Sequence, residues 1–88
     1  MTDTKYNGWT NYATWRINLE MFDGFNPVEE WGLERETLTE SELAELLKEH
    51  AEELVSETTP EGLALDYALA FMADVNWYEI ASHMLEDY

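Results

Sequence analysis

The sequence predicts an all-α protein, folded as a compact single-domain bundle of four main helices and one short helical turn. Helix-capping residues recur along the chain, and apolar residues follow helical rather than strand periodicity. The chain of 88 residues is 45% hydrophobic and 14% aromatic, which is typical of a folded domain and not of a disordered acidic segment, despite its net charge of -16. This length allows one domain (1–88) with one core.

The first predicted helix covers residues 12 to 23, capped by Asn11 and ended by Gly24. Before it lies an N-terminal arm (1–10), in which a short strand or an extended segment both remain open. Placed at 100° steps, the apolar residues of the helix fall on two opposite faces. One face carries Tyr12, Trp15, Leu19 and Phe22, and the other carries Ala13, Ile17 and Met21. Such a helix is either central in its domain or packs against a second partner, including another copy of the chain.

A single helical turn and the longest helix follow. Asn26 and Pro27, with two glutamates after them, predict the short turn. Thr39 and Glu42 form a capping box that opens a helix reaching to about residue 56. Its core face is predicted to contain Leu43, Leu46, Leu47, Leu54 and a semi-buried histidine, His50.

Two further helices complete the bundle. Thr59 is the predicted cap of a helix that has Pro60 at its first position and ends near residue 74; because it is apolar almost all round, it should be the buried hub. Asn76 and Glu79 form the last capping box, and Val75 can pack on the isoleucine at position 80 as a hydrophobic staple. The core stripe of this last helix is Trp77, Ile80, Ala81, Met84 and Tyr88.

The acidic residues are concentrated in the segment 28–61. Twelve of the twenty carboxylates lie there, with Arg35 and Lys48 as the only basic residues. Five glutamates follow one face of the longest helix, where neighbours at this spacing lie ~5–6 Å apart between Cβ atoms. We compare this with the ~7 Å expected between successive phosphates of a nucleic-acid strand. The candidate partner-binding residues are these five, Glu42, Glu45, Glu49, Glu52 and Glu53, with Glu29, Glu30, Glu34 and Glu36 extending the row if the preceding loop folds back beside it.

This charge pattern favours a basic nucleic-acid-binding protein as the partner, because such proteins present Lys and Arg clusters arranged to pair with phosphates. Direct contact with nucleic acid or an anionic membrane is disfavoured by repulsion. A plainly solvated face is the alternative, although such faces usually mix both signs of charge. Adaptation to high salt would also produce an acid excess with little lysine.

Other chemistry has little support in the sequence. Without cysteine there is no disulfide, thiol nucleophile or thiolate metal site, and no cofactor motif is present. His83, with Glu79 and Glu86 on the same face, could approach one metal ion, but we interpret it as an exposed structural histidine and expect neither a metal site nor an enzyme. The start of the chain lacks the apolar core of a signal peptide, and we expect the host cytoplasm as its location.

Two segments carry a family resemblance. Residues 7 to 15, Asn-Gly-Trp-Thr-Asn-Tyr-Ala-Thr-Trp, resemble the opening of a family of small proteins encoded by phages and other mobile elements, whose members commonly begin with "GWTNYxTW" and lack an assigned activity. Residues 75 to 81 resemble the tail of the same family. The resemblance implies a class in which small acidic proteins are similar in role to anti-CRISPR or anti-restriction inhibitors.

Two functional hypotheses follow. In the first, the chain is an acidic nucleic-acid mimic that binds the basic DNA or RNA groove of a host defence complex, with a CRISPR-Cas effector favoured over a restriction enzyme. In the second, it is a non-enzymatic interaction module or homodimer that works through Ala13, Ile17 and Met21. The sequence leaves both a monomer and a homodimer open.

Overall fold

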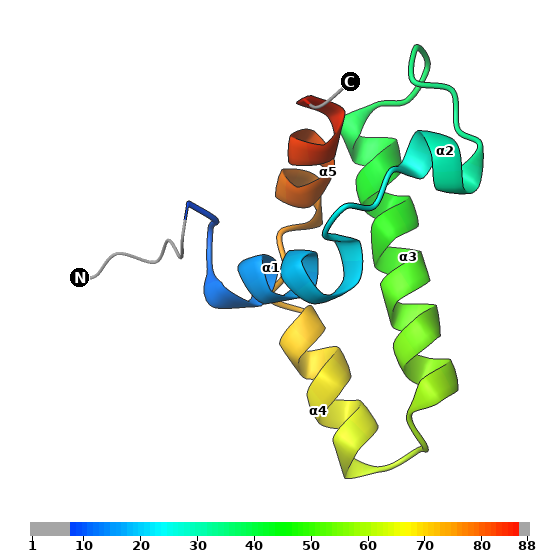
Figure 1. Ribbon diagram of the computed structural model, residues 1–88. Coiled ribbons are helices and arrows are strands. Elements are labelled where there is room, and N and C mark those ends of the chain that lie inside the picture. Colours follow the sequence, from blue (N-terminus) through cyan, green and yellow to red (C-terminus); the bar gives the residue numbers. More distant parts are fainter. Residues whose placement is uncertain (1–7, 87–88) are drawn as a thin grey trace.

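The longest helix, α3 (Glu40–Thr58), runs along the molecule, with α5 beside its N-terminal half and α4 beside its C-terminal half (Figure 1). The computed structural model describes residues 8 to 86. Its helices follow in the order α1 (Tyr12–Ile17), η1 (Asn18–Phe22), α2 (Pro27–Trp31), α3, α4 (Leu63–Met72) and α5 (Trp77–Glu86). The predicted all-α architecture is confirmed, with α1 and the π-helical η1 forming one continuous first helix. Most of the predicted N-terminal arm lies outside the described residues.

The core is the seam between α3 and α5. Leu43, Leu47 and Ala51 of α3 have no solvent exposure, and neither do Ile80 and Ala81 of α5. Their spacing of three or four residues places each set on one helix face, so the two faces meet along their length. The core is completed by Ala13, Ile17, Phe22, Met72, Val75, Met84 and Leu85.

The first helix begins and ends where the sequence predicts. The Asn11 side chain accepts a hydrogen bond from the Thr14 N–H at 2.9 Å, and Gly24, with φ of 76°, follows its end. Ala13 and Ile17 are buried in the core. Neither residue is exposed to carry the contact with a partner that the second hypothesis assigns to them, and α1 contacts α4 and α5. Met21, the third residue of that hypothesis, is partly buried against the same core.

The N-termini of α1 and α5 are joined by a group of polar contacts that we call the clasp: Thr10, Asn11, Thr14, Asp74, Asn76 and Glu79. The Asn76 N–H donates to Thr14 Oγ1 at 2.8 Å, and the Thr10 N–H donates to Glu79 Oε1 at 2.9 Å. Asn11 Nδ2 donates to the carbonyl oxygen of Asp74 at 2.9 Å. The segments 10–14 and 74–79 thus contact each other across more than sixty residues of chain and fix α1 against α5.

The short helix α2 and the start of α3 form as predicted. Asn26 Oδ1 accepts hydrogen bonds from the backbone N–H groups of Val28 and Glu29, at 3.0 and 3.1 Å. The Thr39–Glu42 capping box is present in both directions. The predicted core face of α3 is only partly correct, because Leu46 and Leu54 are 37% and 41% exposed and His50 is exposed as well.

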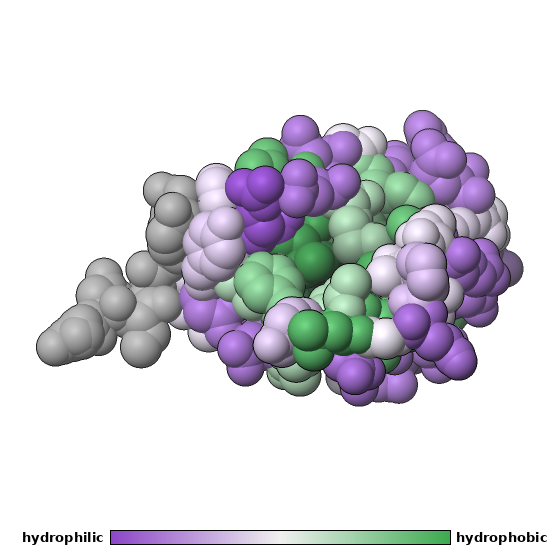
Figure 2. Space-filling model, turned by 90° about the horizontal axis from the view of Figure 1, so that it is seen from below, coloured by the Kyte–Doolittle hydropathy of each residue, from purple (hydrophilic) through white to green (hydrophobic). Residues whose placement is uncertain are grey.

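The prediction that α4 is the buried hub of the bundle is wrong. Of its residues only Met72 is buried, whereas Leu63 is 65% and Tyr67 67% exposed. Figure 2 shows the face on which α4 and the C-terminal end of α3 lie, where hydrophobic side chains surround an open hollow. An apolar sequence shows which sides of a helix could be buried, but it does not determine which sides are covered. In this domain the other elements cover only one side of α4.

The start of α4 also differs from the prediction. Thr59 ends α3, its N–H donating to the Val55 carbonyl oxygen at 3.0 Å, and it does not cap α4. Gly62, with φ of 139°, precedes Leu63, and no side chain caps the helix. Because this φ is readily adopted only by glycine, the chain turns at Gly62 and the helix begins three residues after Pro60.

Helix α5 follows its predicted pattern with one change. Asn76 Oδ1 accepts from the Glu79 N–H at 3.0 Å, and Val75 and Ile80 are both buried in the core. The Glu79 carboxylate does not complete the predicted capping box, because it accepts from Thr10 in the clasp. Tyr88 lies outside the described residues.

Candidate functional site

The outer face of α3 carries a row of carboxylates, which we call the ridge: Glu42, Glu45, Glu49, Glu52 and Glu53. Four of them are exposed and Glu52 is half-buried. At 100° steps they lie opposite Leu43, Leu47 and Ala51, the residues that anchor α3 in the core. The same helix therefore presents an apolar face inward and a carboxylate face outward.

The ridge lacks counter-ions within residues 8 to 86. No α3 carboxylate there lies within 4.0 Å of a Lys, Arg or His nitrogen, including that of Lys48 on the same helix. The arginines are used elsewhere. Arg16 Nε donates to Glu20 Oε2 at 3.0 Å, which raises the pKa of its guanidinium, and Arg35 Nη2 donates to the carbonyl oxygen of Leu85 at 3.4 Å.

The five ridge glutamates are not equivalent. Glu42 Oε1 accepts hydrogen bonds from both the N–H and the hydroxyl of Thr39, each at 3.2 Å. Its carboxylate thus caps the helix N-terminus, which favours negative charge. The carboxylates with no hydrogen bond or ion pair inside the described chain are those of Glu45, Glu49, Glu52 and Glu53.

The preceding segment places its four glutamates differently. Leu33, Glu34 and Leu38 line one shallow pocket together with Glu42 and Leu46, so the loop does fold back beside the N-terminal half of α3 and brings Glu34 to the ridge. Glu29, Glu30 and Glu36 are exposed, and the first two lie in the opening turn of α2. The structure gives these three no direct contact with the ridge glutamates.

Helix α2 is held to α3 by aromatic contacts. The Trp31 ring lies 5.2 Å from the His50 ring, at an interplanar angle of 68°, and Phe22 lies 6.4 Å from the same histidine. His50 and Leu46 lie on the flank of α3 between its core face and the ridge. The acidic first turn of α2 is therefore attached on a side of α3 that adjoins the ridge.

His83 does not form a metal site with its neighbours. Its ring stacks on Trp9 with centroids 4.3 Å apart, and Glu79 is engaged by Thr10. Within residues 8 to 86, no group of three His, Cys, Asp or Glu residues is placed to hold a metal ion.

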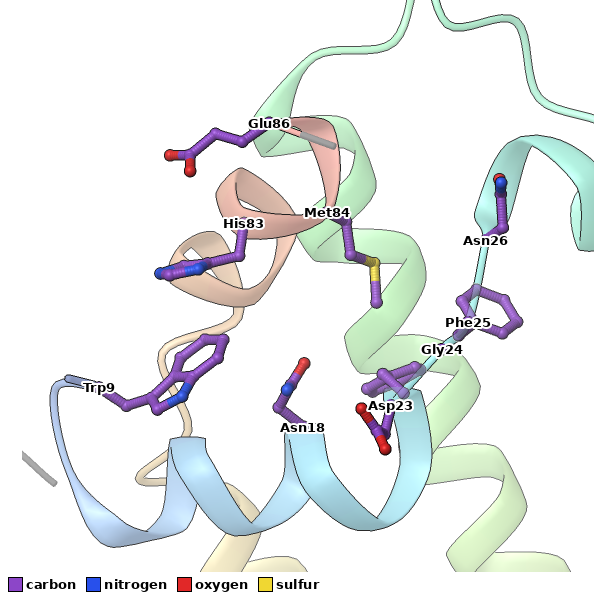
Figure 3. A pocket seen from close by; sticks show the side chains of 10 residues that line it. Trp9, Asn18, Asp23, Gly24, Phe25, Asn26, His83, Met84 and Glu86 are labelled. Carbon is purple, nitrogen blue, oxygen red and sulfur yellow. The ribbon is translucent and has the colours of Figure 1, made fainter. Parts of the chain in front are cut away.

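An open pocket of about 410 Å³ between η1 and α5 was not anticipated from the sequence. Figure 3 shows His83 lying over Trp9 on one side of the pocket and Phe25 on the other. Asn18 and Met84 lie between these two sides. Asp23 and Glu86 also line it, and both are exposed. Its lining comes from distant segments, and no local motif predicts it.

None of the helices in the described range is both long enough and apolar enough to cross a membrane. The chain matches no protein-family model, no curated protein and no solved structure in comparisons with each.

Proposed function

We propose that this chain is an acidic inhibitor that imitates a nucleic-acid strand and binds the basic groove of a nucleic-acid-binding protein. The observation that carries the proposal is the ridge: a row of carboxylates, on a helix of 19 residues, for which residues 8 to 86 provide no counter-ion. The favoured target is a nuclease complex of host defence, a CRISPR-Cas effector ahead of a restriction enzyme. Such a target places the action of the chain in the host cytoplasm.

The charge spacing supports this proposal. Between Glu42 and Glu53 the helix rises about 16 Å, so that five carboxylates give one charge per ~4 Å of axis. One strand of B-form DNA carries one phosphate per ~3.4 Å of axis. A groove lined by Lys and Arg at phosphate spacing can therefore meet several ridge carboxylates at once.

The scaffold supports the proposal as well. Leu43, Leu47 and Ala51 are fully buried behind the ridge, and α5 is fixed in turn by the clasp. The rigid helix backbone beneath these charges loses little conformational entropy on binding, which favours affinity. A solvated acidic face would not require a rigid scaffold. The experiment below distinguishes a solvated face from a nucleic-acid mimic.

The test is affinity capture from a host lysate, followed by competition. The immobilised chain should retain a basic nucleic-acid-binding protein, and the free chain should displace a DNA duplex from that protein. The double variant Glu45→Lys/Glu49→Lys should lose both effects. The control variant Glu61→Lys/Glu86→Lys changes the net charge equally at exposed positions outside the ridge and should retain most of them.

Two results would contradict the proposal. Equal losses in both variants would assign the effect to net charge and not to the ridge. Capture of a partner that does not bind nucleic acid, or that still binds its duplex in the presence of the chain, would exclude mimicry.

A further inference from the structure

Helix α4 exposes a stripe of large apolar side chains. Leu63, Tyr67 and Phe71 are 65%, 67% and 37% exposed and follow one another at intervals of four residues. Each step of four residues rotates by only about 40°, so the three lie on one side of the helix, over ~12 Å of its length. The opposite side, with Leu65, Ala68, Leu69 and Met72, is half-buried or buried against the rest of the domain.

The stripe continues onto the neighbouring helices. The Tyr12 ring of α1 meets Phe71 edge-on, with centroids 6.1 Å apart. Leu54 is 41% exposed on α3, which contacts α4. Leu19 is 45% exposed on η1, on the same side of the first helix as Tyr12. Figure 2 shows hydrophobic side chains gathered around a hollow on this face, with hydrophilic residues at its edge. We call Tyr12, Leu19, Leu54, Leu63, Tyr67 and Phe71 the α4 surface.

We infer that the α4 surface is the interface of a symmetric homodimer, in which two α4 helices cross antiparallel. This inference stands independently of the proposed function. Tyr67 is midway between Leu63 and Phe71, so a two-fold axis beside Tyr67 brings Leu63 of each copy to Phe71 of the other. A self-complementary surface of this kind is what a closed two-fold dimer requires.

The size of the surface fits a dimer. Taking about 200 Å² for a large side chain, the exposed parts of the six residues amount to roughly 600 Å². Monomers seldom expose an apolar patch larger than a few hundred Å². Each partner in a standard interface buries about 800 Å², so the α4 surface and a narrow rim suffice.

The charge distribution favours a second copy over a cationic partner. Between residues 62 and 73 the chain has one ionisable carboxylate, Asp66, so the stripe offers almost no charge to recognise a basic protein. Asp66 lies one 100° step around α4 from Tyr67, so it is at the flank of the helix pair and not between the two stripes. Because the side of α4 opposite the stripe faces the domain, the ridges of two such copies point away from the interface.

The dimer should respond to salt in the opposite direction from the ridge complex. Two chains of charge -16 repel each other, and salt screens that repulsion while leaving apolar contacts intact. Raising NaCl from about 50 to about 500 mM should therefore strengthen self-association. This behaviour separates the dimer from any contact made through carboxylates.

Sedimentation equilibrium on the full chain, without any partner, tests the inference. At about 200 µM the mass should approach twice the 10.3 kDa of one chain, and it should fall on dilution to a few µM. Tyr67→Glu should raise the dimer dissociation constant by about 100-fold or more, because it places two carboxylates beside the axis. Tyr78→Glu is the matched control, since Tyr78 is 54% exposed on α5, outside the stripe, and it should leave the dimer unchanged.

A second variant keeps the test decisive if Tyr67→Glu lowers helicity. The chain has no cysteine, so Tyr67→Cys introduces a single thiol beside the proposed axis and should form an intermolecular disulfide on mild oxidation. Tyr78→Cys should form far less. A strict monomer at about 200 µM, or equal cross-linking of the two variants, overturns the inference.

Discussion

Helices α3 and α4 are neighbours in the chain, and both expose much of their surface, but they expose opposite chemistry. α3 is anchored by three fully buried residues and presents carboxylates to solvent. α4 has one buried residue and presents Leu63, Tyr67 and Phe71. Exposed carboxylates are stable in water without a partner, whereas an exposed aromatic stripe gains free energy when it is covered. The two helices therefore call for different partners and different tests.

The largest expected effect on stability compares one leucine from each helix. Leu47→Ala should lower the free energy of unfolding by about 3 kcal/mol, because Leu47 is fully buried between α3 and α5. Leu63→Ala should lower it by less than about 1 kcal/mol, because Leu63 is 65% exposed. Urea denaturation at about 1 µM protein, where self-association is negligible, measures both. Similar losses would mean that α4 is part of the folding core after all.

A smaller loss of unfolding free energy is expected when the clasp that fixes α1 against α5 is disrupted. Thr14 is fully buried, and its hydroxyl accepts from the Asn76 N–H. Thr14→Val should cost roughly 1–3 kcal/mol, because it leaves that N–H without its partner. Thr58→Val is the control: its hydroxyl donates to the Leu54 carbonyl oxygen at an exposed position, and its loss should cost less than about 0.5 kcal/mol. A Thr14→Val protein as stable as the wild type would contradict the role given to the clasp.

The smallest expected effect has the opposite sign. Glu49→Lys should raise the unfolding free energy by about 0.5 kcal/mol at low salt, because it replaces repulsion from Glu45 and Glu53 by attraction. Glu61→Lys, in the loop before α4, should change it less. Thermal unfolding monitored by circular dichroism at low and high salt measures the difference. Destabilisation by Glu49→Lys would mean that the ridge contributes to folding, which would weaken the case for a surface kept for binding.

Local signals predicted the helix boundaries well. Asn11, Asn26, Thr39 and Asn76 each accept a hydrogen bond from a backbone N–H two or three residues on, so their action is contained in a few neighbouring residues. The division of α3 into a buried side and an exposed side was predicted for the same reason, since helical periodicity separates the ridge from Leu43 and Leu47. The ridge could be predicted because its five residues all lie on one helix, whereas the positions of Glu29, Glu30, Glu34 and Glu36 depend on how the preceding segment folds.

Features that depend on distant segments were missed. The sequence of α4 is apolar almost all round, and nothing in it specifies that α1 and α3 cover only one side. Thr59 and Pro60 form a plausible cap locally, but Gly62 redirects the chain. The clasp joins positions more than sixty residues apart, and its key hydrogen bonds use the Thr14 hydroxyl and the Glu79 carboxylate, which helical spacing alone does not assign.

The central claim, that the ridge replaces phosphates, is tested most directly by the salt dependence of binding to the captured partner. The logarithm of the wild-type association constant should fall steeply and linearly with the logarithm of NaCl concentration, as it does when phosphates are bound by Lys and Arg. Glu45→Lys/Glu49→Lys should bind more weakly and with a shallower slope, whereas Glu61→Lys/Glu86→Lys should keep a slope close to that of the wild type. A wild-type affinity that hardly changes with salt would contradict the claim.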